Sequence, residues 1–247
     1  LSSGKLTVSA SNDTDAKSEA DSKAVADVGI GAAVAINLVG ITNEAIIGAG
    51  TSVLATGVDV KALMRSDAVF DTDSAGKHTI YAKATSGAGA SGSDVGIAGA
   101  FAMNLVDDTT EASIRGGATV DAGSGAVTIA AGNTTDITAI ATSATGGDVG
   151  IGASVALNIV DTNRTLAKIE NTAVLTDAGA VSVTATSGHT LTTTSEAGAA
   201  GGGGAVAPAG AVGVPGKETA GPVGEAGAPL NAAPGDGEGT HHNAGAK

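Results

Sequence analysis

Three aspartates recur at equivalent positions in this sequence and could bind a metal ion. They open three copies of one segment, at Asp27, Asp94 and Asp148. If the copies lie over one another, three carboxylates come together, and a bound cation would relieve their repulsion. Calcium suits such a site because it is a hard ion that takes several oxygen ligands. The alternative is that each aspartate starts a turn and stays hydrated. The calcium-binding repeat G-G-x-G-x-D is absent, and this favours the turn.

Three asparagines recur in the same copies, each ten residues after the aspartate, at Asn37, Asn104 and Asn158. In stacked copies, their side-chain amides would bond to one another along the stack and form a ladder. We therefore predict a structural role for these residues and not a ligand site.

Other kinds of chemistry have little support in the composition. The chain has no cysteine, so it has no disulfide, thiol nucleophile or thiolate metal site. Two Phe and one Tyr are too few to build the aromatic platforms that bind sugar rings. A formal net charge of −13 opposes nucleic acids and anionic membrane surfaces. No apolar run reaches the ~18 residues of a membrane helix. We expect no nucleic-acid partner and no membrane span.

Two elements alternate along the chain and should position these residues. The first reads DVGIGAAVAINLV from Asp27, DVGIAGAFAMNLV from Asp94 and DVGIGASVALNIV from Asp148. The second is a Gly-led run that begins at Gly4, Gly76, Gly125 and Gly179. Successive repeats are 54 residues apart at Asp94 and Asp148 but 67 apart at Asp27 and Asp94. We therefore expect an insertion of about a dozen residues around residues 58–74.

The repeated segment alternates between bulky and small side chains, as a β-strand with two apolar faces would. In the first copy the bulky face consists of Val28, Ile30, Ala32, Val34, Ile36 and Leu38. The small face consists of Gly29, Gly31, Ala33, Ala35 and Asn37. We predict that the bulky face lines the interior. The small face would let a second sheet or a neighbouring chain approach closely.

These patterns predict an all-β fold, a parallel β-solenoid of about 54-residue repeats. A partial first repeat would precede the repeats that start near Asp27, Asp94 and Asp148. Residues 4–27 align without a gap on residues 125–148, so residues 15–27 are predicted to be strand despite their helix propensity. Each repeat contains four candidate strand segments. The sequence leaves open whether they form one wide coil or two narrow ones.

The composition changes near residue 200. All five prolines lie in the last forty residues, within a stretch rich in Gly and Ala. Such a segment buries too little apolar surface to offset its ordering entropy. We predict a solenoid domain over residues 1–199 and a flexible tail without fixed conformation over residues 200–247.

The DVGIGAxVALNxV strand, followed by a T-x-A-x-I stretch and a Gly-led V-x-V-x-A run, resembles the β-strand repeats of very large bacterial secreted adhesins. These are the filamentous-haemagglutinin-like and leukotoxin-like surface proteins. The resemblance covers roughly residues 1–199. It implies an elongated, non-catalytic, autotransporter-like segment that is secreted or displayed on the bacterial cell surface. Its expected partners are neighbouring repeats of the same chain, a host or cell-surface receptor, or other copies of itself.

Two other functions remain open at this stage. A carbohydrate-acting enzyme built on a β-helix could take its acids from a loop such as residues 67–73, which contains Asp71 and Asp73. A homotypic assembly module could pair exposed Gly/Ala faces between chains. The preferred hypothesis is a stalk or adhesive filament with no catalysis of its own and no cofactor besides the calcium considered above.

Overall fold

The computed structural model describes residues 4–65, 76–89, 95–200, 212–214 and 217–224. All regular structure within these ranges is β-strand, arranged in three sheets whose strand pairs are parallel. The all-β prediction with parallel sheets is confirmed. No helix in the described ranges is long and apolar enough to cross a membrane.

The first sheet, here called sheet A, contains strands from both the Gly-led runs and the Thr/Ser-rich stretches that follow them. Its strands are β1 (Leu6–Asn12), β5 (Val58–Met64), β9 (Val127–Gly146), β6 (His78–Ala88), β2 (Asp15–Ala24) and β12 (Val181–Ala200). The first part of β9 pairs with β5, and the second part pairs with β6. β12 pairs with β9 along its whole length. The run and the stretch thus join into one long strand in β9 and β12.

The second sheet, sheet B, is built from the repeated DVG segment and the residues that follow it. Its long strands are β3 (Val28–Ile47), β7 (Val95–Ile114) and β10 (Val149–Ile169). Equivalent residues pair directly, so that Ile97 of the central strand lies between Ile30 and Ile151. The register continues to the ends of the strands and shifts only at Val160/Thr162 of β10.

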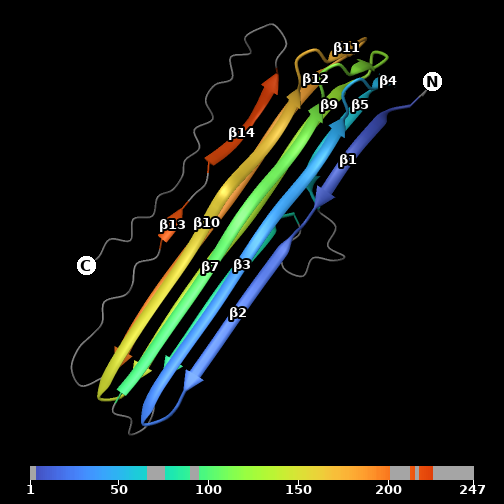
Figure 1. Ribbon diagram of the computed structural model, residues 1–247. Coiled ribbons are helices and arrows are strands. Elements are labelled where there is room, and N and C mark those ends of the chain that lie inside the picture. The colour runs from blue at the N-terminus through green and yellow to red at the C-terminus, as the bar shows by residue number, and fades with distance from the viewer. Residues whose placement is uncertain (1–3, 66–75, 90–94, 201–211, 215–216, 225–247) are drawn as a thin grey trace.

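The third sheet, sheet C, is short and consists of β4 (Ser52–Leu54), β8 (Thr119–Asp121) and β11 (Val174–Thr176). From β9 the chain passes to β10 in sheet B, to β11 in sheet C and back to β12 in sheet A. This repeat gives one strand to each sheet, whereas the two earlier repeats each have four strands, because the run and the stretch form separate strands of sheet A, β1 and β2 or β5 and β6. Figure 1 shows the long strands side by side along the molecule, with β4 and β11 at one end.

Two local predictions can be judged from the strand register. Residues 15–24 form strand β2, and both Leu6 and Asp15 occupy the stacking positions that the ungapped alignment gives them. The equivalence of the Gly76 and Gly125 runs is wrong, because Val58 pairs with Val127 whereas His78 pairs with Thr135. Most of the extra residues of that repeat therefore lie between Met64 and His78.

The prediction that the bulky face of the repeated strand lines the interior is wrong. Ala33 and Ala35 are 5% and 3% exposed, whereas Ile30 and Leu38 are 66% and 71% exposed. Sheet A packs so closely on this part of sheet B that a Cβ built on Gly31 would lie 2.5 Å from a backbone oxygen of sheet A. Small residues, mainly Gly, Ala and Ser, fit between the sheets, so the large aliphatic side chains point outward. Of the two neighbours considered for the small face, the second sheet is the one present.

We call this part of the molecule the narrow section. Its buried apolar core contains only alanines: Ala33, Ala35, Ala82, Ala84, Ala100, Ala102, Ala139, Ala141 and Ala156. The other end, near sheet C, is the wide section. Its largest buried side chains are Ile47, Val58, Val60, Ile114, Val120, Val127 and Ile129. Here three sheets enclose the interior, so branched aliphatic side chains fit inside.

Part of the predicted tail forms strands. β13 (Val212–Val214) and β14 (Lys217–Gly224) pair with β10 and extend sheet B beyond it. Pro222 lies within β14, where it is compatible with an edge strand because an outward backbone donor is not needed there. The remaining residues after 200 lie outside the described ranges.

Candidate functional site

Two of the three aspartates of the predicted calcium site, Asp27 and Asp148, lie at bends of the chain. Asp27 and Asp148 immediately precede β3 and β10, and both are exposed. Asp94 lies outside the described residues. Because β7 stands between β3 and β10, Asp27 and Asp148 are separated by two strand spacings, about 10 Å. No group of three or more metal-binding side chains occurs within the described ranges. Calcium binding stays a prediction.

The three asparagines form a continuous ladder. The Asn37 amide donates to Oδ1 of Asn104 at 2.9 Å, and the Asn104 amide donates to Oδ1 of Asn158 at 2.8 Å. Their side chains point inward from sheet B, and the three residues are 8%, 0% and 0% exposed. The direct register of β3, β7 and β10 brings identical side chains to neighbouring positions, as the sequence repeat requires.

Each amide of the ladder also bonds across to sheet A. Asn37, Asn104 and Asn158 donate at 2.8 Å to the backbone oxygens of three equivalent residues, Tyr81, Thr138 and Thr192. The ladder thus ties the two sheets together at the end of the narrow section. Since both donor positions of each amide are used inside the protein, this arrangement serves packing and sheet registration.

A second polar layer lies inside the molecule between the ladder and the wide section. Asp108, only 1% exposed, accepts hydrogen bonds at its Oδ2 from Asn133 at 2.6 Å and from Thr135 at 2.9 Å. His78 is fully buried, and its Nδ1 accepts a hydrogen bond from the backbone nitrogen of Thr14 at 2.9 Å. Burial lowers the pKa of His78, although the nearby carboxylates of Asp108 and of Asp15 act in the opposite direction. The imidazole is therefore neutral at pH 7.

Sequence reasoning missed this layer because the Gly76 run was placed in the wrong register and Asp108 does not recur. Along the stacked positions, His78 pairs with Thr135, which pairs with His189, and Asp108 lies between Ile41 and Asn163. From the sequence, only the alternation of inward and outward residues along the strands could have predicted that these side chains are buried.

An ion-pair cluster closes the wide section at the ends of β7 and β10. Arg115 contacts Glu111 at 2.9 Å and Glu170 at 2.7 Å, and Lys168 contacts Glu170 at 2.7 Å. Glu170 also accepts a hydrogen bond from the backbone nitrogen of Gly116 at 3.0 Å. Hydrogen bonds from Lys168, Gly116 and Arg115 lower the pKa of Glu170 to about 2. This carboxylate is thus ionised throughout the neutral and mildly acidic range.

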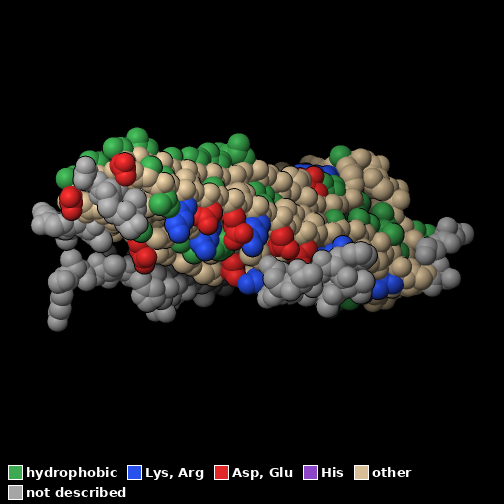
Figure 2. Space-filling model, turned by 90° about the horizontal axis from the view of Figure 1, so that it is seen from below, with side chains coloured by type: hydrophobic (Ala, Val, Ile, Leu, Met, Phe, Trp, Pro, Cys, Tyr) green, Lys and Arg blue, Asp and Glu red, His purple; other side chains and the backbone are tan. Residues whose placement is uncertain are grey.

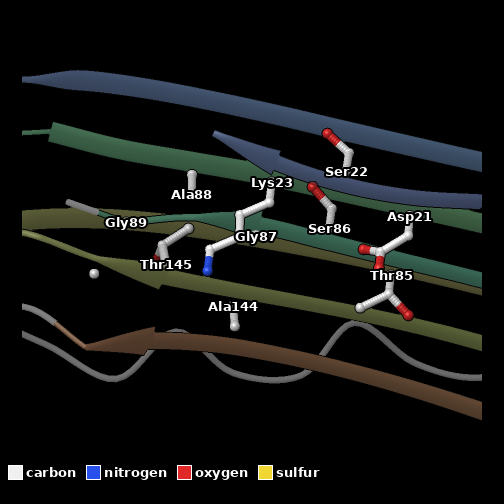
Figure 3. A pocket seen from close by; sticks show the side chains of 11 residues that line it. Asp21, Ser22, Lys23, Thr85, Ser86, Gly87, Ala88, Gly89, Ala144 and Thr145 are labelled. Carbon is white, nitrogen blue, oxygen red and sulfur yellow. The ribbon is translucent and has the colours of Figure 1, made fainter. Parts of the chain in front are cut away.

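A shallow depression of about 380 Å³ lies at the ends of β2, β6 and β9. Figure 3 shows that the labelled side chains around it are short, apart from Asp21 and Lys23 of β2. It exists because Gly87, Gly89 and Gly146 carry no side chain there. The lining supplies one carboxylate, one ammonium and several hydroxyls, which can hydrogen-bond a polar ligand. It does not contain the paired carboxylates of a glycosidase.

The acids of the enzyme hypothesis, Asp71 and Asp73, lie outside the described residues. Comparisons with family models, with curated proteins and with solved structures give no match. The functional proposal must therefore be drawn from the buried asparagine ladder, the buried polar layer and the outer faces of sheets A and B.

Proposed function

We propose that the chain is a β-solenoid segment that serves as a non-catalytic structural or adhesive part of a large secreted or cell-surface bacterial protein. The observation that carries this proposal is the direct register of sheet B, in which Ile30, Ile97 and Ile151 stand side by side. Such stacking is additive, since each repeat contacts only its neighbours and a further repeat would extend every sheet by one strand. The asparagine ladder supports it because the ladder gains one rung per repeat.

The dimensions of one repeat indicate what kind of structure an array would form. A 20-residue strand such as β3 is about 66 Å long, whereas each added repeat raises the stack by only about 4.8 Å. Fifty-four residues therefore add little length and much lateral surface. We infer a wide, stiff ribbon whose side faces make the contacts, more than a thin spacer that separates two ends.

The proposal is tested by adding a repeat. In the test variant, residues 127–180 occur twice in succession, which inserts one more strand into each sheet at matching junctions. We expect a higher thermal midpoint, because an added repeat contributes its interfaces with both neighbours. Small-angle X-ray scattering should show an unchanged longest dimension and a stack taller by about 4.8 Å. An inserted repeat that unfolds separately, or that lengthens the particle along the strands, would contradict the proposal.

Catalysis is tested on the unmodified chain. Polysaccharide turnover by the full chain, lost in the variant Asp71→Asn/Asp73→Asn, would replace this proposal with the carbohydrate-acting alternative. We expect the same absence of turnover in both proteins.

A further inference from the structure

The outward side of sheet B carries a continuous uncharged surface, which we call the outer aliphatic face. It consists of six rows across the three long strands: Val28–Val95–Val149, Ile30–Ile97–Ile151, Ala32–Gly99–Ala153, Val34–Phe101–Val155, Ile36–Met103–Leu157 and Leu38–Leu105–Ile159. None of these eighteen positions is charged or polar. Many of the side chains are well exposed, among them Ile30 at 66%, Val149 at 52% and Val155 at 43%.

The size of this face is large for a protein surface left in water. Three strands at about 4.8 Å and eleven residues at about 3.3 Å give about 14 Å by 36 Å, a footprint of about 500 Å². Soluble monomers rarely expose apolar patches beyond a few hundred Å² unless the patch is a binding site. The area is more than half of the roughly 800 Å² that each partner contributes to a standard protein interface.

Charged residues gather on another surface. Lys17, Glu19, Asp21 and Lys23 alternate along β2 on the outer side of sheet A. Figure 2 shows charged side chains in a row that is separate from the hydrophobic side chains along the upper margin. The two sheets therefore present outer faces of opposite character. The outer aliphatic face itself offers no charge for a charged partner.

A lipid surface fits this face poorly. Proteins that lie on membranes combine an apolar face with Lys, Arg, Trp or Tyr side chains at its rim. Here the chain has no Trp and one Tyr, and its net charge of −13 opposes anionic lipids. The matching surface must be flat and apolar, and this chain supplies one itself.

The relief of the face is suited to a second copy. The row Ala32–Gly99–Ala153 forms a trough, because the rows on both sides carry branched or aromatic side chains. A Cβ built on Gly99 would meet no atom within 4 Å, so the trough opens outward. When two sheets pack face to face, rows of one inner surface interdigitate with those of the other at about 10 Å separation. Ridges of one copy could enter the trough of the other, and a two-fold axis would make the contact reciprocal.

We propose that the outer aliphatic face binds the same face of a second copy of this chain, forming a symmetric dimer of two sheets B packed against each other. This inference deepens the proposed function, on which it rests, by naming the partner of the ribbon's side face. In an array of many repeats, the same contact would join two ribbons along their length. The exposed Gly/Ala pairing considered from the sequence is replaced, since that face is buried against sheet A.

The negative charge of the chain opposes association. The β2 charges lie on the outer side of sheet A, with both sheets between them and the proposed contact, whereas the exposed Asp27, Asp107 and Asp148 border the outer aliphatic face at its two ends. At physiological ionic strength the Debye length is about 8 Å, so most of this repulsion is screened. Added salt should therefore strengthen the dimer, whereas it would weaken a contact made by ion pairs.

The test measures the mass of the full chain by sedimentation equilibrium between about 1 and 100 µM. We expect a monomer–dimer equilibrium in the unmodified chain. Gly99→Lys places a charge in the trough, at a position where the added Cβ meets no atom within 4 Å. It should raise the dimer dissociation constant by about 100-fold or more, because a buried unpaired charge is costly. Ile97→Lys, one row away, should act likewise. Thr134→Lys, exposed on the outer side of sheet A, is the matched control and should leave dimerisation unchanged.

Each contrary outcome identifies another occupant. An unmodified chain that stays monomeric at all concentrations overturns the proposal. If it also binds neutral or anionic vesicles and Gly99→Lys abolishes binding, the occupant is lipid. If hydrogen exchange of a monomer shows the face protected until Gly99→Lys exposes it, the occupant is another part of the chain. A dimer that survives both Lys substitutions uses a sheet edge instead. In all these cases the result of the added-repeat experiment still decides the proposed function separately.

Scattering gives an independent measure of the geometry. A face-to-face dimer doubles the thickness of the particle over the narrow section and leaves the height of the stack unchanged. A dimer formed by edge-to-edge strand pairing would instead double the height of the stack, and this result would overturn the proposal.

Discussion

The narrow and wide sections are built from the same strands but pack in opposite ways. In the narrow section sheets A and B touch through small residues, mainly Gly, Ala and Ser, and the large aliphatic side chains of β3, β7 and β10 point outward. In the wide section sheet C holds the sheets further apart, and side chains such as Ile114 and Ile129 fill the interior. The separation of the sheets, and not hydrophobicity alone, thus decides which face of a strand is buried.

This difference also separates two roles. The wide section contains the large aliphatic core that stabilises the fold, since buried aliphatic groups contribute most to folding free energy. The narrow section contributes less core per residue and leaves an apolar outer surface available for a partner. The asparagine ladder stands where the narrow section ends and holds the two sheets together there.

The largest expected effect compares the same residue type in the two sections. Ile114→Ala in the wide section should lower the free energy of unfolding by about 2–5 kcal/mol, because it leaves a cavity around a fully buried position. Ile30→Ala in the narrow section should change it by less than about 0.5 kcal/mol, because this side chain is 66% exposed. Urea unfolding at low protein concentration measures both. Equal losses would show that the two sections do not differ as described.

The next effect concerns the spacing of the sheets. Gly31→Val should destabilise the fold by about 1–3 kcal/mol, because its Cβ would press on the backbone of Gly87 and the sheets would have to separate. Gly99→Val adds the same side chain on the opposite side of the same sheet, where nothing lies within 4 Å of the Cβ. It should be neutral or stabilising, since β-branched residues favour strands. Thermal unfolding compares the pair. A tolerated Gly31→Val would mean that sheet contact does not require glycine.

Much of the fold follows from the repeat, because identical segments in register predict parallel stacking and the Asn37, Asn104 and Asn158 ladder. The sequence does not show which face of the repeated strand is buried, since both faces are apolar and periodicity alone gives no preference between them. The decisive fact, the close approach of sheet A at Gly31, belongs to the tertiary structure. His78 and Asp108 could not be predicted as neighbours because Asp108 does not recur and only the strand register shows that His78 and His189 share a stacking position. The Gly76 run was misaligned because its GKHTIYA pattern mimics the start of a longer strand.

A smaller effect tests the boundary between the sections. Asn104→Ala should lower the free energy of unfolding by about 1–3 kcal/mol, because it leaves the Asn37 amide without its acceptor and Oδ1 of Asn158 without its donor. Thr134→Ala is the control, since Thr134 is exposed. Differential scanning calorimetry measures both, and sedimentation should show dimerisation of Asn104→Ala unchanged where it is folded. If Asn104→Ala melts at the same temperature as the unmodified chain, the ladder does not contribute to stability.

The smallest expected effect is the pH dependence of stability that Glu170 gives to the wide section. The folded-state pKa of Glu170 is about 2, below the usual value of 4.5, so its ionised form stabilises the fold above about pH 4.5. That stabilisation declines as the pH falls from 4.5 towards 2, because the unfolded chain binds the proton first. Glu170→Gln should cost about 1 kcal/mol at pH 7, a modest figure because the side chain is 31% exposed and partly screened. The difference from the unmodified chain should shrink steadily below pH 4.5. If the cost of Glu170→Gln were the same at pH 3 and pH 7, the cluster would stabilise the wide section through packing and not through charge.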